Sequence, residues 1–207
     1  MDKQKFRVDC SHANICKSKL IMKKNLYYKV GNKGNVDFNN RWNDLEKILD
    51  LKNTDTVLDI GCAEGLISIE VAKKVKHVEA FELELHRVNV AKENAEKNKV
   101  KNIFFSVASF LNFNYQTYNK VLCLGVYHKI QQANARIPAL ERMFRSCTDQ
   151  FYIRVPVLDG TVPIDRGIEE KEIIDTAFRS GFDLVVKTKQ RPNHGSIFKF
   201  AKRINTV

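Results

Sequence analysis

The sequence predicts an α/β fold in which a mostly parallel sheet has helices on both faces. Strand-like and helix-like segments alternate along most of the 207 residues, and a glycine-rich turn follows the first strand-like segment. Such alternation implies βαβ crossovers, which cover both faces of a parallel sheet. Only residues 190–195 separate the last two strand-like segments. This connection is too short for a parallel crossover, so we expect an antiparallel C-terminal hairpin at or near the sheet edge.

Apolar and β-branched runs predict seven strands, and apolar spacing of three to four residues predicts five helices. The strands are expected at residues 55–61, 77–83, 103–107, 120–126, 150–157, 183–189 and 196–201. The helices are expected at residues 41–51, 65–74, 85–99, 133–146 and 169–180. We expect Phe104 and Phe105 to be buried in the core, because they fall within one of these strands.

Composition indicates one domain with a full core and excludes several classes of protein. The chain is 43% hydrophobic and 29% charged, and it has no uncharged apolar run long enough to span a membrane. The charged start lacks the apolar segment of a secretory signal, which predicts a cytoplasmic location. Five cysteines without a Cys-x-x-Cys pair favour reduced thiols, so neither a disulfide framework nor a metal site is expected.

The net charge of +11 is concentrated at the two ends. Residues 1–35 hold nine basic and two acidic side chains, and residues 187–203 hold six basic and no acidic ones. We interpret residues 1–40 as a basic arm or lid and residues 41–207 as the main domain. Basic residues near a site predict an anionic partner, such as RNA, a phosphorylated glycan or a small metabolite. The alternative is a solvated surface that maintains solubility.

The turn after the first strand is the first candidate site, because ligands of open parallel sheets lie beyond the carboxyl ends of the strands. Gly61 and Gly65 would allow the backbone to approach a ligand closely. The turn lacks the Lys-Ser/Thr of a phosphate-binding P-loop, and Asp59 suits a cationic group instead. Glu82 ends the second strand about 20 residues later, where a carboxylate can accept both hydroxyls of a ribose.

The strand, glycine turn and following acid resemble the class I S-adenosylmethionine-dependent methyltransferases, whose seven-strand order residues 55–201 match. The resemblance implies a Rossmann-like fold and S-adenosylmethionine as the cofactor. It also implies twelve cofactor contacts: Asp59, Gly61, Cys62, Ala63 and Gly65 at the methionine end, Glu82 at the ribose, Leu83, Ser109 and Phe110 at the adenine, and Leu124, Gly125 and Val126 near the sulfonium. Ser109 stands where the family usually has an aspartate.

Residues 124–130, Leu-Gly-Val-Tyr-His-Lys-Ile, resemble a stretch of the tRNA wobble-uridine carboxymethyltransferases and of the methyltransferases that terminate O-antigen chains. His128 is the candidate catalytic residue, since an imidazole of ordinary pKa could accept a proton from a hydroxyl nucleophile. It could equally contact the ligand without proton transfer, because sulfonium chemistry depends largely on positioning. Tyr127, Lys189 and Arg191 are candidate substrate-binding residues.

Two functions remain open from these residues. The first is S-adenosylmethionine-dependent methyl transfer to an O or N atom of an anionic acceptor. The second is a non-catalytic nucleotide- or RNA-binding module that retains the fold, which the missing acid at Ser109 makes conceivable. The presence of Asp59, Gly61, Gly65 and Glu82 favours the enzyme.

Overall fold

The computed structural model describes residues 27–28, 37–130, 132–190 and 195–204. The chain divides into two compact units, residues 1–37 and residues 38–207. In the first unit, the rings of Tyr27 and Tyr28 meet edge to face at 5.0 Å. Most of the predicted arm, residues 1–40, lies outside the described residues, so its role as a lid stays a proposal. The second unit carries the named helices and strands.

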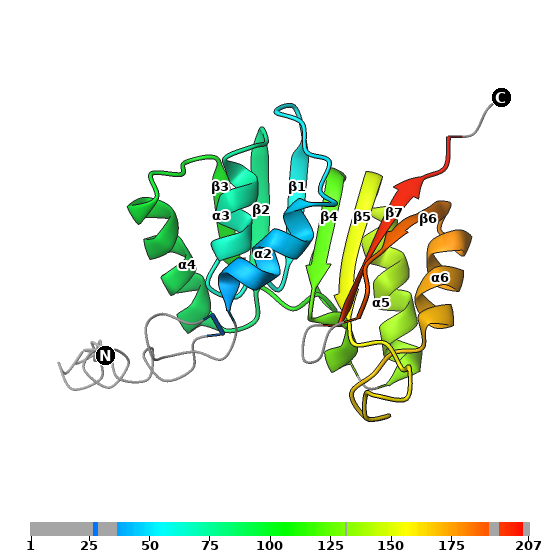
Figure 1. Cartoon of the computed structure of the whole chain (residues 1–207). Coiled ribbons are helices and arrows are strands. Elements are labelled where there is room, and N and C mark those ends of the chain that lie inside the picture. Colours follow the sequence, from blue (N-terminus) through cyan, green and yellow to red (C-terminus); the bar gives the residue numbers. More distant parts are fainter. Residues whose placement is uncertain (1–26, 29–36, 131, 191–194, 205–207) are drawn as a thin grey trace, which may run out of the picture. The chain divides into compact units, whose positions relative to one another are not determined.

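A seven-stranded sheet forms the centre of the second unit, as predicted, in the order β3-β2-β1-β4-β5-β7-β6 (Figure 1). Strands β1 to β5 pair in parallel, and β7 is antiparallel to both β5 and β6. The predicted hairpin is therefore confirmed. The strands are β1 Thr56–Ile60, β2 His77–Glu82, β3 Ile103–Val107, β4 Tyr118–Leu124, β5 Cys147–Val155, β6 Phe182–Lys187 and β7 Ser196–Lys202.

Helices pack on both faces of this sheet. They are α2 Phe38–Glu46, α3 Leu66–Ala72, α4 Leu85–Lys97, α5 Ala133–Arg145 and α6 Glu170–Arg179, with a 3₁₀ turn, η1, at Tyr127–Lys129. Figure 1 shows α2 and α3 in front of the sheet and α5 behind it. Helix α2 begins before the predicted residue 41 and ends before residue 51. Each predicted helix is present with boundaries shifted by a few residues, which is where sequence patterns carry least information.

The central strands are buried because neighbouring strands and helices enclose them on all sides. Leu58 and Ile60 in β1 and Val121 in β4 are completely inaccessible to solvent. The expected burial of Phe104 is wrong: its side chain is 57% exposed, whereas Phe105 is 3% exposed. Strand β3 lies at the edge of the sheet, so it has one strand neighbour and a face open to water.

Candidate active site

The register of the parallel strands brings the predicted residues to one edge of the sheet. Ile60 pairs with Phe81 in β2 and with Cys123 in β4, so the residues that follow these three leave the sheet at the same level. The amide of Gly61 donates a hydrogen bond of 2.9 Å to the carbonyl oxygen of Phe81. Three of the four segments predicted to bind the cofactor therefore meet here, and the fourth, at Ser109, follows the neighbouring strand β3.

The turn from β1 into α3 needs glycine for both conformational and steric reasons. Gly61 has φ of +74° and Gly65 has φ of +75°, which L side chains rarely adopt. A Cβ atom on Gly61 would lie 2.1 Å from Cγ2 of Val126, and one on Gly65 would lie 2.8 Å from Cζ of Phe105. Ala63 also has a positive φ, of 50°. Such backbone strain at a strand end is typical of ligand-binding turns.

Glu82 is held at the end of β2 by three backbone amides. Its Oε2 accepts a hydrogen bond of 3.1 Å from the amide of Ala63, and its Oε1 accepts one of 2.7 Å from the amide of Leu83 and one of 3.4 Å from the amide of Glu84. The side chain is half-buried rather than enclosed. Because a carboxylate offers about four acceptor positions and three are used here, one remains to accept from a ribose hydroxyl. The donor set of S-adenosylmethionine therefore fits this residue.

Asp59 is the buried acid of the turn, with 3% of its surface exposed. Burial raises its pKa to about 6, and the charge of Glu82 adds to that rise. A hydrogen bond of 2.5 Å from the hydroxyl of Ser68, and then the charge of Arg154, act in the opposite direction. A cationic amino group placed here would stabilise the ionised carboxylate. Ser68 was not identified from the sequence, since a serine within a helix carries no distinctive signal.

The adenine end of the predicted site is more open. Leu83 is 66% exposed. The hydroxyl of Ser109 accepts a hydrogen bond of 3.3 Å from the amide of Leu111, so Ser109 caps the turn in this structure. Phe110 packs partly against the core. The amide of Ala108 donates to the carbonyl oxygen of Glu82, which keeps this segment beside the ribose position.

At the predicted methionine end, the side chains of Cys62 and Ala63 are buried. Burial raises the pKa of the Cys62 thiol well above its ordinary range, so this thiol stays protonated. Leu124 is the last residue of β4, Gly125 and Val126 follow it, and the Gly125 backbone has φ of +89°. Their contacts with the cofactor stay a prediction.

His128 lies in η1 and is more buried than the sequence indicated. Burial, together with the charges of Lys129 and Arg41, lowers its pKa to about 4. The expectation of an ordinary imidazole pKa is therefore wrong, because water does not reach enough of the ring to solvate its cation. Among the described residues, the buried Nδ1 atom has no hydrogen-bond partner. His128 is a neutral imidazole at physiological pH and a weak base.

Tyr127 anchors the turn that carries His128. Its side chain is fully buried, and its hydroxyl donates a hydrogen bond of 2.6 Å to Glu172 in α6. Two nitrogens of Arg136 in α5 bind the same carboxylate at 2.8 Å and 2.5 Å. Such a bidentate, charge-assisted pair is geometrically specific. This placement assigns Tyr127 to packing, and it gives the predicted substrate contact no support.

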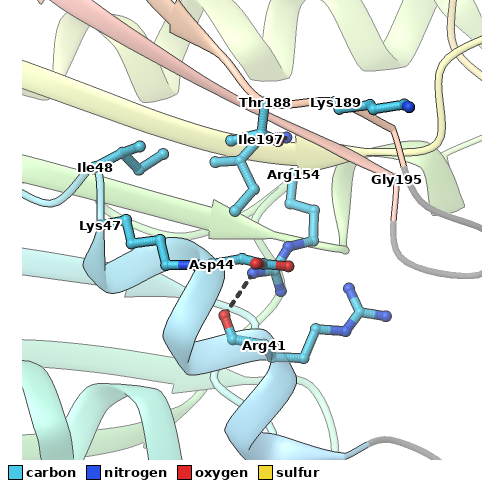
Figure 2. Close-up of a pocket in the computed structure, with 9 residues that line it drawn as sticks. All are labelled: Arg41, Asp44, Lys47, Ile48, Arg154, Thr188, Lys189, Gly195 and Ile197. Carbon is cyan, nitrogen blue, oxygen red and sulfur yellow. Dashed lines mark hydrogen bonds between the residues drawn. The ribbon is translucent and has the colours of Figure 1, made fainter.

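A pocket of about 200 Å³ lies beside the end of β5, between α2 and the β6–β7 hairpin. Figure 2 shows Arg41 entering it from α2 and Arg154 from β5. The predicted substrate residue Lys189 lines this pocket, whereas Arg191 lies outside the described residues. Arg41 and Arg154 were missed by the sequence analysis. The available signal was an arginine inside the apolar run of residues 150–157, where a core strand would carry an apolar side chain.

The described part of the chain contains no group of three or more side chains that could hold a metal ion. No helix in the same residues has the length and apolar character needed to cross a membrane. The three described cysteines, Cys62, Cys123 and Cys147, are free and buried.

Replacing Asp59 by Asn should stabilise the protein in the absence of ligand. The folded-state pKa of about 6 lies above the ordinary value of 3.8, so ionised Asp59 destabilises the fold at every pH above 6. The gain in melting temperature should be largest above pH 6 and should shrink as the pH falls from 6 towards 4. Thermal denaturation across this range measures it, with the exposed Asp165→Asn as control. A lower melting temperature for Asp59→Asn at pH 8 would contradict the assignment.

Replacing Glu82 by Ala should weaken S-adenosylmethionine binding by about 1 to 3 kcal/mol, because a charge-assisted hydrogen bond to the ribose is lost. Calorimetry with S-adenosylmethionine and S-adenosylhomocysteine measures the change. Glu93→Ala, an exposed carboxylate on α4, is the matched control. An unchanged affinity in the Glu82 variant would move the ribose site elsewhere.

Known proteins of similar sequence match short parts of this chain. A 23S rRNA (uracil(1939)-C(5))-methyltransferase of Vesicomyosocius okutanii is 36% identical over 83 residues, which cover 37% of this chain and 19% of that protein. A candidate protein N5-glutamine methyltransferase of Methanocaldococcus jannaschii is 44% identical over 69 residues, which cover 33% of this chain and 34% of that protein. The chain thus spans about a third or less of these relatives.

The fold and the family are shown by longer matches. The magnesium protoporphyrin IX methyltransferase of Synechocystis PCC 6803, crystallised with bound S-adenosylmethionine, superposes with a TM-score of 0.69 at 14% identity and covers 92% of both chains. The sequence pattern of a family described as "Methyltransferase domain" matches residues 51–189, which include the glycine turn, Glu82 and the segment after β4. The chain therefore belongs to this family, the class I S-adenosylmethionine-dependent methyltransferases.

Proposed function

We propose that this chain transfers a methyl group from S-adenosylmethionine to an O or N atom of an anionic acceptor. One observation carries the proposal. At the carboxyl end of the sheet, which we call the cofactor edge, the acids Asp59 and Glu82 lie near the arginines Arg41 and Arg154. The amide of Gly125 donates a hydrogen bond of 3.0 Å to the carbonyl oxygen of Arg154. The charge of Arg154 also lowers the pKa of Asp59, and that of Arg41 lowers the pKa of His128.

The protein's own residues position the reactants in this proposal. Asp59 would hold the amino group of the cofactor, Glu82 its ribose, and the Gly61 turn its methionine chain. When bound, the cofactor supplies an activated methyl group on a sulfonium. Because that group is already reactive, alignment of the acceptor atom contributes most of the remaining rate. His128, as a neutral imidazole, would orient the acceptor by a hydrogen bond rather than remove a proton.

Our proposal for the acceptor specifies only its negative charge. The named relatives act on different groups, since one is an rRNA uracil methyltransferase and the other a candidate protein glutamine methyltransferase. The residues Gly125, Val126, Tyr127 and His128 support a place near the tRNA wobble-uridine and O-antigen groups. RNA, a phosphorylated glycan and a small metabolite all carry the required charge. A cytoplasmic location is part of the same proposal.

Methyl transfer into fractionated cell extract tests the proposal. Radiolabel from S-adenosylmethionine should enter an acidic fraction, and pretreatment with ribonuclease or with phosphatase should identify RNA or a phosphorylated acceptor. The Glu82→Ala variant supplies the background. If no fraction is labelled above this background although calorimetry shows cofactor binding, the chain is a non-catalytic binding module.

His128→Gln should reduce turnover of the labelled acceptor by about tenfold, the value of one hydrogen bond, rather than by the 10²-fold or more expected for a general base. Turnover of the wild type and of His128→Gln should depend on pH in parallel between pH 6 and 8, because the pKa of His128 is about 4 and its charge does not change in this range. The exposed His77→Gln is the control. An inflection near pH 6.5 that the His128 variant lacks would restore the general-base assignment.

A further inference from the structure

The residues that line the pocket beside β5 carry an excess of positive charge. Its lining comprises Arg41, Asp44, Lys47, Ile48, Arg154, Thr188, Lys189, Gly195 and Ile197. Among these described residues, four are cationic and one is anionic, which leaves three positive charges in excess. Lys47 and Lys189 are exposed at its rim, whereas Arg41 is 6% exposed and Arg154 is 3% exposed. Guanidinium groups at this depth are poorly screened by water, so their charge acts strongly on a group that enters the pocket.

The two arginines are held in place by the backbone. Nη2 of Arg154 donates a hydrogen bond of 3.1 Å to the carbonyl oxygen of Arg41, which joins β5 to α2 (Figure 2). The β6–β7 connection forms the opposite wall. At Gly195 the chain has φ of +71°, and a Cβ atom there would lie 2.3 Å from the carbonyl oxygen of Val155. This close approach sets the distance between the hairpin and the end of β5.

A hydroxyl lies on the same wall. The Oγ1 atom of Thr188 accepts a hydrogen bond of 2.9 Å from the amide of Ile197, which fixes the side chain and directs its own O–H away from that amide. Planar guanidinium forks match the oxygen geometry of phosphate and carboxylate, and a hydroxyl is a common third donor to such groups. The pocket therefore combines the donors that recognise one oxyanion.

Size and position indicate which part of a ligand enters. A volume of about 200 Å³ is smaller than the 300 to 1,000 Å³ typical of sites for whole drug-sized molecules, so one group of a larger molecule fits best. The pocket adjoins the cofactor edge, because Arg154, the penultimate residue of β5, pairs with Leu124, the last residue of β4. A molecule anchored here by one end would present its remaining atoms to the segment of Gly125 and His128.

We infer that this pocket is an oxyanion subsite that binds a phosphate or carboxylate group of the methyl acceptor through Arg41 and Arg154, with Lys47, Thr188 and Lys189 at its rim. Its role in holding the acceptor rests on the proposed function, whereas the binding of an oxyanion does not. The subsite determines specificity: it selects acceptors with a terminal anionic group a short distance from the methylated atom.

Nuclear magnetic resonance of the full chain, labelled with ¹⁵N in its arginines and measured with S-adenosylhomocysteine in excess, tests the inference. Methyl phosphate is the probe in one titration and acetate in the other. The Nε–Hε signals of Arg41 and Arg154 should shift together and saturate, with one dissociation constant for both. Saturation by methyl phosphate alone identifies a phosphate site, and saturation by acetate alone identifies a carboxylate site. If neither probe saturates these two signals, the inference is wrong.

Variants give the test a second measurement. Arg41→Gln should weaken binding of the effective probe by about tenfold to a hundredfold, the loss of a hydrogen bond between charged groups. If that variant does not fold, the exposed Lys189→Ala should weaken binding by up to about fivefold, as a rim charge does. Lys101→Ala, which changes an exposed lysine outside the pocket lining, should leave probe binding unchanged. Equal affinity in wild type, Arg41→Gln and Lys189→Ala would overturn the assignment.

The same sample separates this inference from the proposed function. Probe binding without binding of S-adenosylhomocysteine would leave the oxyanion pocket in place and remove the methyltransferase site. Binding of S-adenosylhomocysteine without probe binding would leave the cofactor site in place and remove the subsite.

Discussion

The close contact between Gly61 and Val126 is the constraint on which the geometry of the cofactor edge depends. A hydrogen atom at Gly61 allows the turn after β1 to pack directly against the segment after β4, where any Cβ would collide with Val126 at 2.1 Å. This contact aligns the turn with Glu82, whose carboxylate then binds the amide of Ala63. The two halves of the cofactor edge, which lie more than sixty residues apart in sequence, are joined at this point.

Burial has the same effect on Asp59, two residues before Gly61, and on His128, two residues after Val126. It raises the pKa of Asp59 to about 6 and lowers that of His128 to about 4, so each group favours its neutral form. The site is therefore electrostatically poorly screened. A cationic cofactor beside Asp59 and an anionic acceptor beside the arginines would each replace solvation that burial has removed. In the function we propose, charge complementarity with these two ligands accounts for the acids and arginines on adjacent parts of one edge.

Two buried basic residues within strands, Lys120 and Arg154, have similar sequence patterns but different surroundings in the structure. Lys120 in β4 is completely buried and forms an ion pair with Asp149 at the amino end of the sheet. Arg154 in β5 is almost as buried, but it lies at the carboxyl end and lines the pocket. Lys120 begins an apolar run and Arg154 interrupts one. Whether such a residue forms a buried ion pair or lines a pocket depends on strand direction and on partners distant in sequence.

The sequence by itself determined the class of fold, the succession of strands and helices along the chain, and the candidate cofactor residues at Asp59, Gly61, Gly65 and Glu82. These features depend on local periodicity, on turn chemistry and on the rule that ligands lie beyond the carboxyl ends of parallel strands. Such signals operate over short stretches of chain, so a single sequence contains them.

Tertiary structure alone decided the exposure of Phe104, the pKa of His128, the packing role of Tyr127 and the existence of the pocket at Arg41 and Arg154. Each of these depends on segments that meet only when the sheet has formed. They are the edge strand β3, the arginine of α2 near His128, the carboxylate of α6 and the hairpin beside β5. Burial and partner identity are properties of packing, and no local pattern encodes them.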